Sequence, residues 1–220
     1  MTAARYRAVI FDFGGVFTTS PVENFAAYEQ RLGLPDRFIG GVIKANLHGG
    51  AFARFERAEI SFEEFDALFS AETRAAGHEI GGRDFVALLD VTLKPEMIEA
   101  LRRVKAAGLK AGCITNNFEG LDPVKSERIS KGDAAIAEVF AMFDHVIESS
   151  KVGVRKPEPR IYEMMVDALG VPAPACVFLD DLGVNLKPAQ AMGMRTIKVP
   201  FGDVRPAIDE LSSLLELPLR

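Results

Sequence analysis

Three short apolar runs, each followed directly by chemically active side chains, constrain the fold of this chain more than any other feature. The runs and the residues that follow them are 7–11 with Asp12, 109–114 with Thr115 and Asn116, and 175–179 with Asp180 and Asp181. Apolar runs of this length are typical of strands that are buried on both faces of a parallel sheet. Because ligands bind at the carboxyl ends of strands in open α/β sheets, we expect these side chains to meet at one edge.

The segments around these runs predict helices and two further strands. We predict helices at 95–107, 133–140, 158–169, 185–192 and 207–215, and strands at 145–147 and 195–199. The polar segment 117–131 contains Gly120 and Pro123, so we predict a loop there. The alternation of strands and helices predicts an α/β fold with a Rossmann-like, doubly wound parallel sheet.

One long segment interrupts this alternation directly after the first strand. We predict four helices in it, at 21–32, 36–47, 61–75 and 82–89. Ser61 and Glu64 have the spacing of a capping box at the start of the third. We therefore divide the chain into a core, formed by residues 1–17 and 94–220, and an all-helical insert, formed by residues 18–93.

Composition limits the class of partner and the compartment. The 220 residues carry a net charge of -5, which gives no basic surface for nucleic acid. No apolar stretch is long enough to span a membrane, and the segment before the first strand is too short for a signal peptide. Cys113 and Cys176 both fall within strand-like runs, as buried reduced thiols do. We expect a cytoplasmic protein of 220 residues, whose oligomeric state the sequence does not indicate.

The ordered set of Asp12, Thr115, Lys156 and the Asp180-Asp181 pair resembles the four motifs of the haloacid dehalogenase-like (HAD) hydrolase superfamily. Segments 147–162 and 178–189 are similar to the N-terminal phosphatase domain of soluble epoxide hydrolase. The resemblance covers essentially the whole chain, although it is diffuse in the insert. It implies an HAD-like core and identifies the helical insert as a cap domain.

The resemblance also implies roles for the residues that bind and attack the substrate. Asp12 would be the nucleophile that attacks phosphorus and forms an acyl phosphate. Lys156 would contact both this nucleophile and the phosphate, and its positive charge would keep Asp12 ionised. Thr115 and Asn116 would donate hydrogen bonds to phosphate oxygens. The implied substrate is a small-molecule phosphate ester.

The implied cofactor is Mg²⁺, which prefers oxygen ligands. Asp12, Asp181 and the main-chain carbonyl of Gly14 would supply three of them, and Asp180 would act through a bound water or orient the site. Two adjacent acids after a buried strand repel one another unless a cation or hydrogen bonds compensate. A purely structural role is therefore a poor explanation of the pair.

Gly14 is the one clear departure from the family pattern. Most HAD phosphatases have a second aspartate there, which protonates the leaving oxygen and then activates water. Such a group is worth ~10²–10⁴-fold in rate. Thr18 and Thr19 are weak substitutes by chemical type. We therefore predict a slow Mg²⁺-dependent phosphatase that acts on a small or lipid-like phosphate monoester.

Two alternatives remain open. A 2-haloacid dehalogenase also uses an aspartate nucleophile without the second acid, but it needs no metal and leaves Asp180 and Asp181 without a purpose. A catalytically weakened HAD protein would bind a phosphorylated ligand without turning it over. Halide release that is insensitive to a chelator would favour the first, and tight binding without turnover the second.

The insert offers three candidates for substrate selection. His48 precedes Gly49 and Gly50 between two predicted helices, where caps of this type direct a loop at the site; a plain surface histidine is the simpler interpretation. Phe52 and Phe55 either belong to the core of a helical bundle or line an apolar substrate tunnel.

Arg155, beside Lys156, is expected to be a solvated charge.

Overall fold

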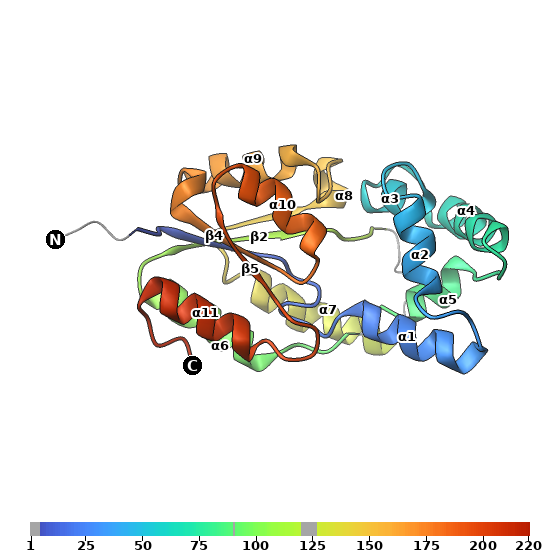
Figure 1. Cartoon of the computed structure of the whole chain (residues 1–220), viewed down its shortest axis with the longest axis horizontal. Helices are drawn as coiled ribbons and strands as arrows, with labels where there is room; N and C mark the ends of the chain where they lie inside the picture. Colours follow the sequence, from blue (N-terminus) through green and yellow to red (C-terminus); the bar gives the residue numbers. More distant parts are fainter. Residues whose placement is uncertain (1–4, 90, 120–126) are drawn as a thin grey trace.

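The computed structural model describes residues 5–89, 91–119 and 127–220. Its centre is a sheet of five parallel strands in the order β3-β2-β1-β4-β5 (Figure 1). The strands are β1 (Ala8–Phe11), β2 (Lys110–Thr115), β3 (His145–Glu148), β4 (Cys176–Asp180) and β5 (Arg195–Lys198). The predicted doubly wound α/β fold is therefore confirmed, with the first strand at the centre of the sheet.

Helices cover both faces of this sheet because successive strand residues point in opposite directions. Val9 and Phe11 pack in one buried cluster, with helices α6 and α11, whereas Ala8 and Ile10 pack in another, with α9. Figure 1 shows α6, α7 and α11 on one side of the sheet and α9 and α10 on the other. These core helices are α6 (Pro95–Ala106), α7 (Glu127–Phe140), α8 (Ser149–Val152), α9 (Pro159–Leu169), α10 (Gly183–Ala191) and α11 (Arg205–Leu215), and a 3₁₀ turn spans Ala173–Ala175.

The prediction of a loop at 117–131 is wrong for residues 127–131. Helix α7 already begins at Glu127, so residues 127–131 are helical. Gly132 lies inside this helix, where a glycine costs only about 1 kcal/mol and does not stop it. Residues 120–126 of the predicted loop lie outside the described residues. The short helices α3 and α8 had no counterpart among the predicted elements.

The insert forms a second layered body with its own apolar core. Its helices are α1 (Pro21–Leu32), α2 (Phe38–Ala45), α3 (Ala51–Glu56), α4 (Phe62–Ala75) and α5 (Gly82–Ala87). The predicted capping box is present at the start of α4, where Ser61 and Glu64 each bond the other's main-chain N–H. Buried phenylalanines from all five of these helices form one cluster, separate from the two clusters of the sheet. Within the described part of the chain, no helix combines the length and the apolar character needed to cross a membrane.

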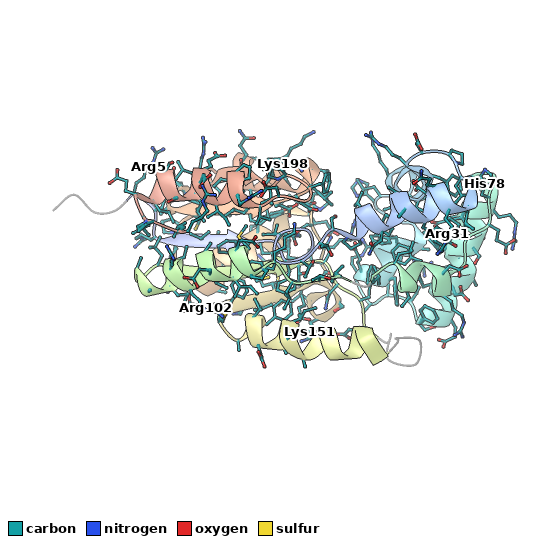
Figure 2. All side chains as sticks on the ribbon, turned by 90° about the horizontal axis from the view of Figure 1, so that it is seen from below. Arg5, Arg31, His78, Arg102, Lys151 and Lys198 are labelled. Atoms are coloured by element: carbon teal, nitrogen blue, oxygen red, sulfur yellow. The ribbon has the colours of Figure 1, made fainter. Side chains whose placement is uncertain are left out.

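The two segments that connect the insert to the core lie side by side. Thr18 pairs with Leu93 in an antiparallel bridge, and the Thr19 N–H donates to the Thr92 carbonyl at 2.8 Å. Figure 2 shows the side chains of the core, with Arg102 and Lys198, and those of the insert, with His78, as two bodies joined along this narrow region. We retain residues 17/18 and 93/94 as the proposed boundaries, because they fall at this bridge.

Candidate active site

The carboxyl ends of three neighbouring strands form the site. The register aligns Phe11 with Cys113 and with Leu179, so the residues that follow these positions emerge at one edge of the sheet. These residues include Asp12 directly after β1, Thr115 at the end of β2, Asp180 at the end of β4, and Asp181. All four are buried, with exposed fractions of 6% or less. The structure thus brings together side chains that lie more than 160 positions apart.

Lys156 joins two of these acids. Its Nζ atom lies 2.6 Å from Oδ1 of Asp12 and 2.9 Å from Oδ2 of Asp180, and only 2% of the residue is exposed. Burial lowers the pKa of the Lys156 amine, but the two carboxylates outweigh this effect and raise the pKa above its usual value. Lys156 is therefore a fixed ammonium group beside the predicted nucleophile. Burial raises the pKa of Asp12, and Lys156 opposes this effect.

Asp12, Asp180 and Asp181 form an acidic cluster suited to a hard cation. Each offers a carboxylate oxygen, and these atoms lie within 4.8 Å of one another. Burial, followed by the nearby Asp180 carboxylate, raises the pKa of Asp181 to about 6. Three carboxylates face the ammonium of Lys156, and Lys198 has only a minor effect on Asp181, so an excess of negative charge is left among these described groups. Mg²⁺ prefers oxygen ligands such as carboxylates, and its positive charge would offset this negative charge, so the residues fit the predicted metal.

Asp180 differs from the other two acids because protein donors surround it. Its Oδ1 atom accepts from the Leu182 N–H at 2.7 Å, and Asn185 Nδ2 lies 3.1 Å from both carboxylate oxygens. Its Oδ2 atom also accepts from Lys156. This environment agrees with an orienting or water-mediated role for Asp180. Asp181, in contrast, accepts a single side-chain hydrogen bond, at 3.2 Å from Ser20, among those found in the described residues.

The two glycines after Asp12 have different surroundings. Gly15 has a φ of +75°, and a Cβ atom built on it would lie 2.0 Å from Oδ2 of Asp181, so only glycine fits. A Cβ atom on Gly14 would meet nothing within 4 Å. The position of the missing family acid is therefore open space. Thr18, a weak substitute by type, has its hydroxyl within 3.4 Å of the Gly15 N–H and donates it to the Thr19 carbonyl.

Asn116 has an organising contact with the lysine loop. Its Oδ1 atom accepts from the Lys156 N–H at 2.9 Å, and its Nδ2 atom lies 3.1 Å from the Lys156 carbonyl and 3.4 Å from Glu56 Oε2. Both amide hydrogens of the Asn116 side chain are thereby used. The predicted donation from this side chain to phosphate therefore requires an exchange of partners, whereas Thr115 at the strand end makes only a weak 3.5 Å contact with the Asn116 carbonyl.

Arg155 is not the solvated charge that its position beside Lys156 suggested. It is 6% exposed, and its Nε atom lies 2.5 Å from Oε2 of Glu56, a residue of α3 that is itself 4% exposed. Sequence reasoning missed this pair because the partners lie 99 positions apart in segments without a shared motif. It also assigned no role to Ser20. Asn185 was part of the resemblance, and its contacts with Asp180 now explain its place there.

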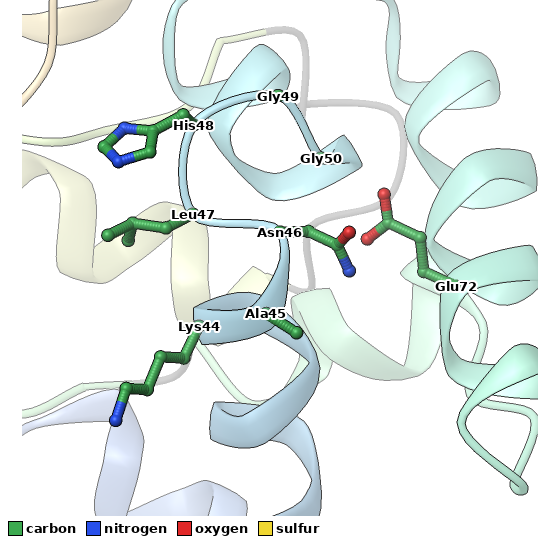
Figure 3. A pocket seen from close by; sticks show the side chains of 8 residues that line it. All are labelled: Lys44, Ala45, Asn46, Leu47, His48, Gly49, Gly50 and Glu72. Atoms are coloured by element: carbon green, nitrogen blue, oxygen red, sulfur yellow. The ribbon is translucent and has the colours of Figure 1, made fainter.

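The three residues proposed for substrate selection lie in different surroundings. His48 is exposed and borders a hollow of about 510 Å³ that contains none of the acidic cluster. Figure 3 shows Asn46 and Glu72 facing one another across this hollow, with His48 directed away from them. Phe55 is buried and Phe52 is half-buried, and both contact the ring of Phe118, which follows the Thr115-Asn116 motif. Their roles in substrate selection remain predictions.

Comparison with known proteins supports the identity suggested by this geometry. A family model described as haloacid dehalogenase-like hydrolase matches residues 6–193. Mouse acyl-CoA dehydrogenase family member 10 is 35% identical over 97% of this chain, and pig bifunctional epoxide hydrolase 2 is 32% identical over 97%. The chain spans only 20% and 39% of these two relatives. A phosphatase of Mycobacterium tuberculosis, MT3486, is 31% identical over 94% of both chains.

Solved structures share the fold at lower sequence identity. An HAD-family enzyme of Bacteroides thetaiotaomicron, in complex with magnesium and inorganic phosphate, aligns with a TM-score of 0.58 at 18% identity, covering 90% of this chain and 96% of that one. A dehalogenase with an intermediate complex aligns with a TM-score of 0.66 at 16% identity, covering 97% and 98%. Because the family model spans most of the sequence and the relatives include an epoxide hydrolase and a phosphatase, this chain belongs to the haloacid dehalogenase-like hydrolases.

Proposed function

We propose that the protein is a Mg²⁺-dependent phosphatase that acts on a phosphate monoester through an aspartyl-phosphate on Asp12. The observation that carries this proposal is the buried ammonium of Lys156, which bridges Asp12 and Asp180, with the carboxylate of Asp181 in the same acidic cluster. Phosphoryl transfer needs positioning and charge neutralisation more than any other contribution from the protein. A fixed cation next to a carboxylate nucleophile, in an oxygen-rich cluster, supplies both.

The first step transfers the phosphoryl group to the protein. An Asp12 carboxylate oxygen attacks phosphorus, the bond from phosphorus to the ester oxygen breaks, and the alcohol leaves. Lys156 neutralises negative charge on Asp12 and on the transferred group, and Thr115 donates its hydroxyl to a phosphate oxygen. Mg²⁺, held by Asp12, Asp181 and the Gly14 carbonyl, would supply further neutralisation of the phosphate charge. Water then hydrolyses the acyl phosphate and regenerates Asp12.

Proton transfer is the weak part of this cycle. The leaving alkoxide needs a proton, and Gly14 offers no side chain to deliver it. Solvent must then supply this proton, at a cost of ~10²–10⁴-fold in rate relative to a positioned acid. We therefore expect slow turnover, fastest with esters whose leaving group is a weak base.

The substrate we propose is small or lipid-like. Phe118 follows the phosphate-binding motif and touches the insert's aromatic side chains, including the half-buried Phe52. An apolar substituent next to the phosphate would meet these rings. The similarity to bifunctional epoxide hydrolase 2 and to a mycobacterial phosphatase supports phosphate monoesters as the class.

A metal-independent dehalogenase is the weaker candidate. Its support is a shared fold at 16% identity, and that chemistry gives no role to the clustered Asp180 and Asp181. The test is phosphate release from a panel of phosphate monoesters, lipid phosphates included, at saturating Mg²⁺. We expect turnover that both Asp12→Asn and a chelator abolish. Halide release from 2-haloacids that survives the chelator would instead establish the dehalogenase, and ester binding without turnover would establish a binding protein.

A further inference from the structure

A buried ion pair connects the helical insert to the core beside the site. Glu56, the last residue of α3, accepts from Arg155 Nε at 2.5 Å, and Arg155 Nη1 also donates to the Leu47 carbonyl at 2.8 Å. Glu56 and Arg155 are 4% and 6% exposed. Two charges removed from water in this way add little net stability compared with an apolar pair, because desolvation offsets their attraction. What the pair supplies is a fixed, directional contact between the two parts of the chain.

The same end of α3 also holds the loop that follows β2. The Glu56 carbonyl accepts from Ser149 Oγ at 2.6 Å, and that Oγ accepts from the Asn117 N–H at 3.1 Å. The Glu56 carboxylate lies 3.4 Å from Asn116 Nδ2. The ring of Phe118 stacks on Phe55 of α3, with ring centroids 5.1 Å apart. Polar and aromatic contacts thus fix residues 116–118 against one helix of the insert.

Asn116 connects this end of α3 to Lys156 by hydrogen bonds. Its side-chain amide pairs with both the N–H and the carbonyl of Lys156, at 2.9 and 3.1 Å. Glu56 therefore reaches the main chain of Lys156 by two routes: through Asn116, and through Arg155, the preceding residue. The Lys156 ammonium at the other end of this connection bridges Asp12 and Asp180.

We propose that Glu56, with Arg155, is a positioning residue for catalysis: it fixes Asn116 and thereby the main chain that carries Lys156, so that the lysine is aligned with Asp12 only while α3 is seated on the core. This proposal rests on the proposed phosphatase function. It gives the insert a role in the alignment of the phosphate-binding groups, in addition to substrate selection.

The test is a double-mutant cycle on kcat/KM between Glu56→Ala and Asn116→Ala. We expect Glu56→Ala alone to lower kcat/KM by about 10-fold or more, the effect of a lost hydrogen bond to a charged group. In the Asn116→Ala background, the same substitution should have a clearly smaller effect, because the route through Asn116 is already cut and only the route through Arg155 remains. Glu56→Gln keeps an acceptor of the same shape and should restore most of the activity.

A matched control exists at the same interface. Arg57 of the insert and Glu158 of the core form an ion pair at 3.6 Å, with side chains that are 13% and 39% exposed, and the Glu158 side chain makes no cap hydrogen bond. Glu158→Ala removes a contact between insert and core without touching Asn116, so kcat/KM should stay within about twofold of wild type. Equal losses from Glu56→Ala and Glu158→Ala would overturn the positioning role, as would additive losses in the cycle.

A second variant guards against misfolding, since Glu56→Ala leaves the Arg155 charge buried and unpaired. Glu56→Leu with Arg155→Leu replaces the pair by apolar groups, which buried cores tolerate well. This variant should fold, as judged by circular dichroism, and show the same loss of kcat/KM; wild-type activity in it would refute the proposal.

The affinity for inorganic phosphate in the presence of Mg²⁺ separates this proposal from the proposed function. If the wild type turns over no monoester, the phosphatase function fails, and the cycle is read from phosphate affinity instead. A coupled loss on Glu56→Ala and Asn116→Ala then still supports the positioning role. Uncoupled losses, or no phosphate binding by the wild type, would overturn it.

Discussion

The adjacent glycines after Asp12 allow the missing acid to be tested by substitution. A side chain at Gly14 enters open space, whereas one at Gly15 collides with Asp181. Gly14 also lies outside the left-handed backbone region, so a substitution there carries no conformational strain of that kind. We predict that Gly14→Asp raises the turnover of phosphate monoesters and that Gly15→Ala abolishes it.

The magnitude follows from the proton-transfer step and from the surrounding charges. A positioned general acid is worth ~10²–10⁴-fold, or about 3–5 kcal/mol at 1.36 kcal/mol per factor of ten. The new carboxyl group would stand two positions from Asp12, whose negative charge would raise its pKa and favour the protonated form that a general acid needs. The added charge also opposes the approach of an anionic ester, so we expect a gain in kcat near the lower end, about 10²-fold, with a higher KM.

The assay is steady-state phosphate release at saturating Mg²⁺. Gly14→Asn is the control, because its side chain has nearly the same size but cannot act as a general acid. Esters with poor leaving groups should gain most, because they depend most on protonation. The reasoning is refuted if Gly14→Asp and Gly14→Asn have equal kcat while both fold and bind Mg²⁺. Activity in Gly15→Ala equal to that of the wild type would show that Asp181 does not need its observed position.

Three further predictions concern stability. Burial raises the pKa of Glu56 to about 7 from 4.5, so the folded protein retains a proton that the unfolded chain releases across this window. The free energy of unfolding should therefore fall by about 3 kcal/mol as the pH rises from about 4.5 to 7. Urea unfolding of Glu56→Gln over the same pH range should lack this decrease. A decrease in the variant equal to that of the wild type would contradict the prediction. With chelator present, the melting temperature of Asp181→Asn should be no lower than that of the wild type, because burial and Asp180 oppose the Asp181 charge. Mg²⁺ at 100 times its Kd should stabilise the wild type by about 2.7 kcal/mol and the variant by less. Equal stabilisation of both proteins would show that Asp181 does not bind the metal. Phe118→Ala should cost about 2 kcal/mol in urea unfolding through its lost contact with Phe55, and a cost below about 0.5 kcal/mol would show that the loop is not anchored by that ring.

The sequence was informative where chemistry and local structure coincide. Asp12, Thr115 and Asp180 each stand at the end of a run typical of a buried strand, so their meeting at one sheet edge follows from the topology of parallel sheets. Local patterns were less reliable where a helix contains a residue that usually ends one. The start of α7 was missed because the polar segment 117–131, with Gly120 and Pro123, predicted a loop to its end, whereas the helix begins at Glu127 and continues through Gly132.

The contacts between insert and core were beyond sequence reasoning for a different reason. Arg155 stands beside Lys156 in a loop, and a charge in a loop is most often solvated. Its burial depends on Glu56. The position of Glu56 depends in turn on the packing of α3 against the segments that follow β2 and β3, which are distant in sequence. Such a pair has no periodicity and no characteristic spacing, so only the assembled structure defines it.

This difference bears on how the insert acts in catalysis. If the insert served only to select substrates, its contacts with the core could be any set that holds it in place, and partly exposed pairs such as Arg57 with Glu158 would suffice. Instead, α3 directs a carboxylate at Asn116, whose side chain is in turn committed to the main chain of Lys156. Lys156, which neutralises Asp12 in the proposed mechanism, is therefore held from both sides, by the acids of the core and by a helix of the insert. Under the proposed positioning role, displacement of α3 should loosen Lys156, and the alignment of Asp12 would then depend on the seating of the insert.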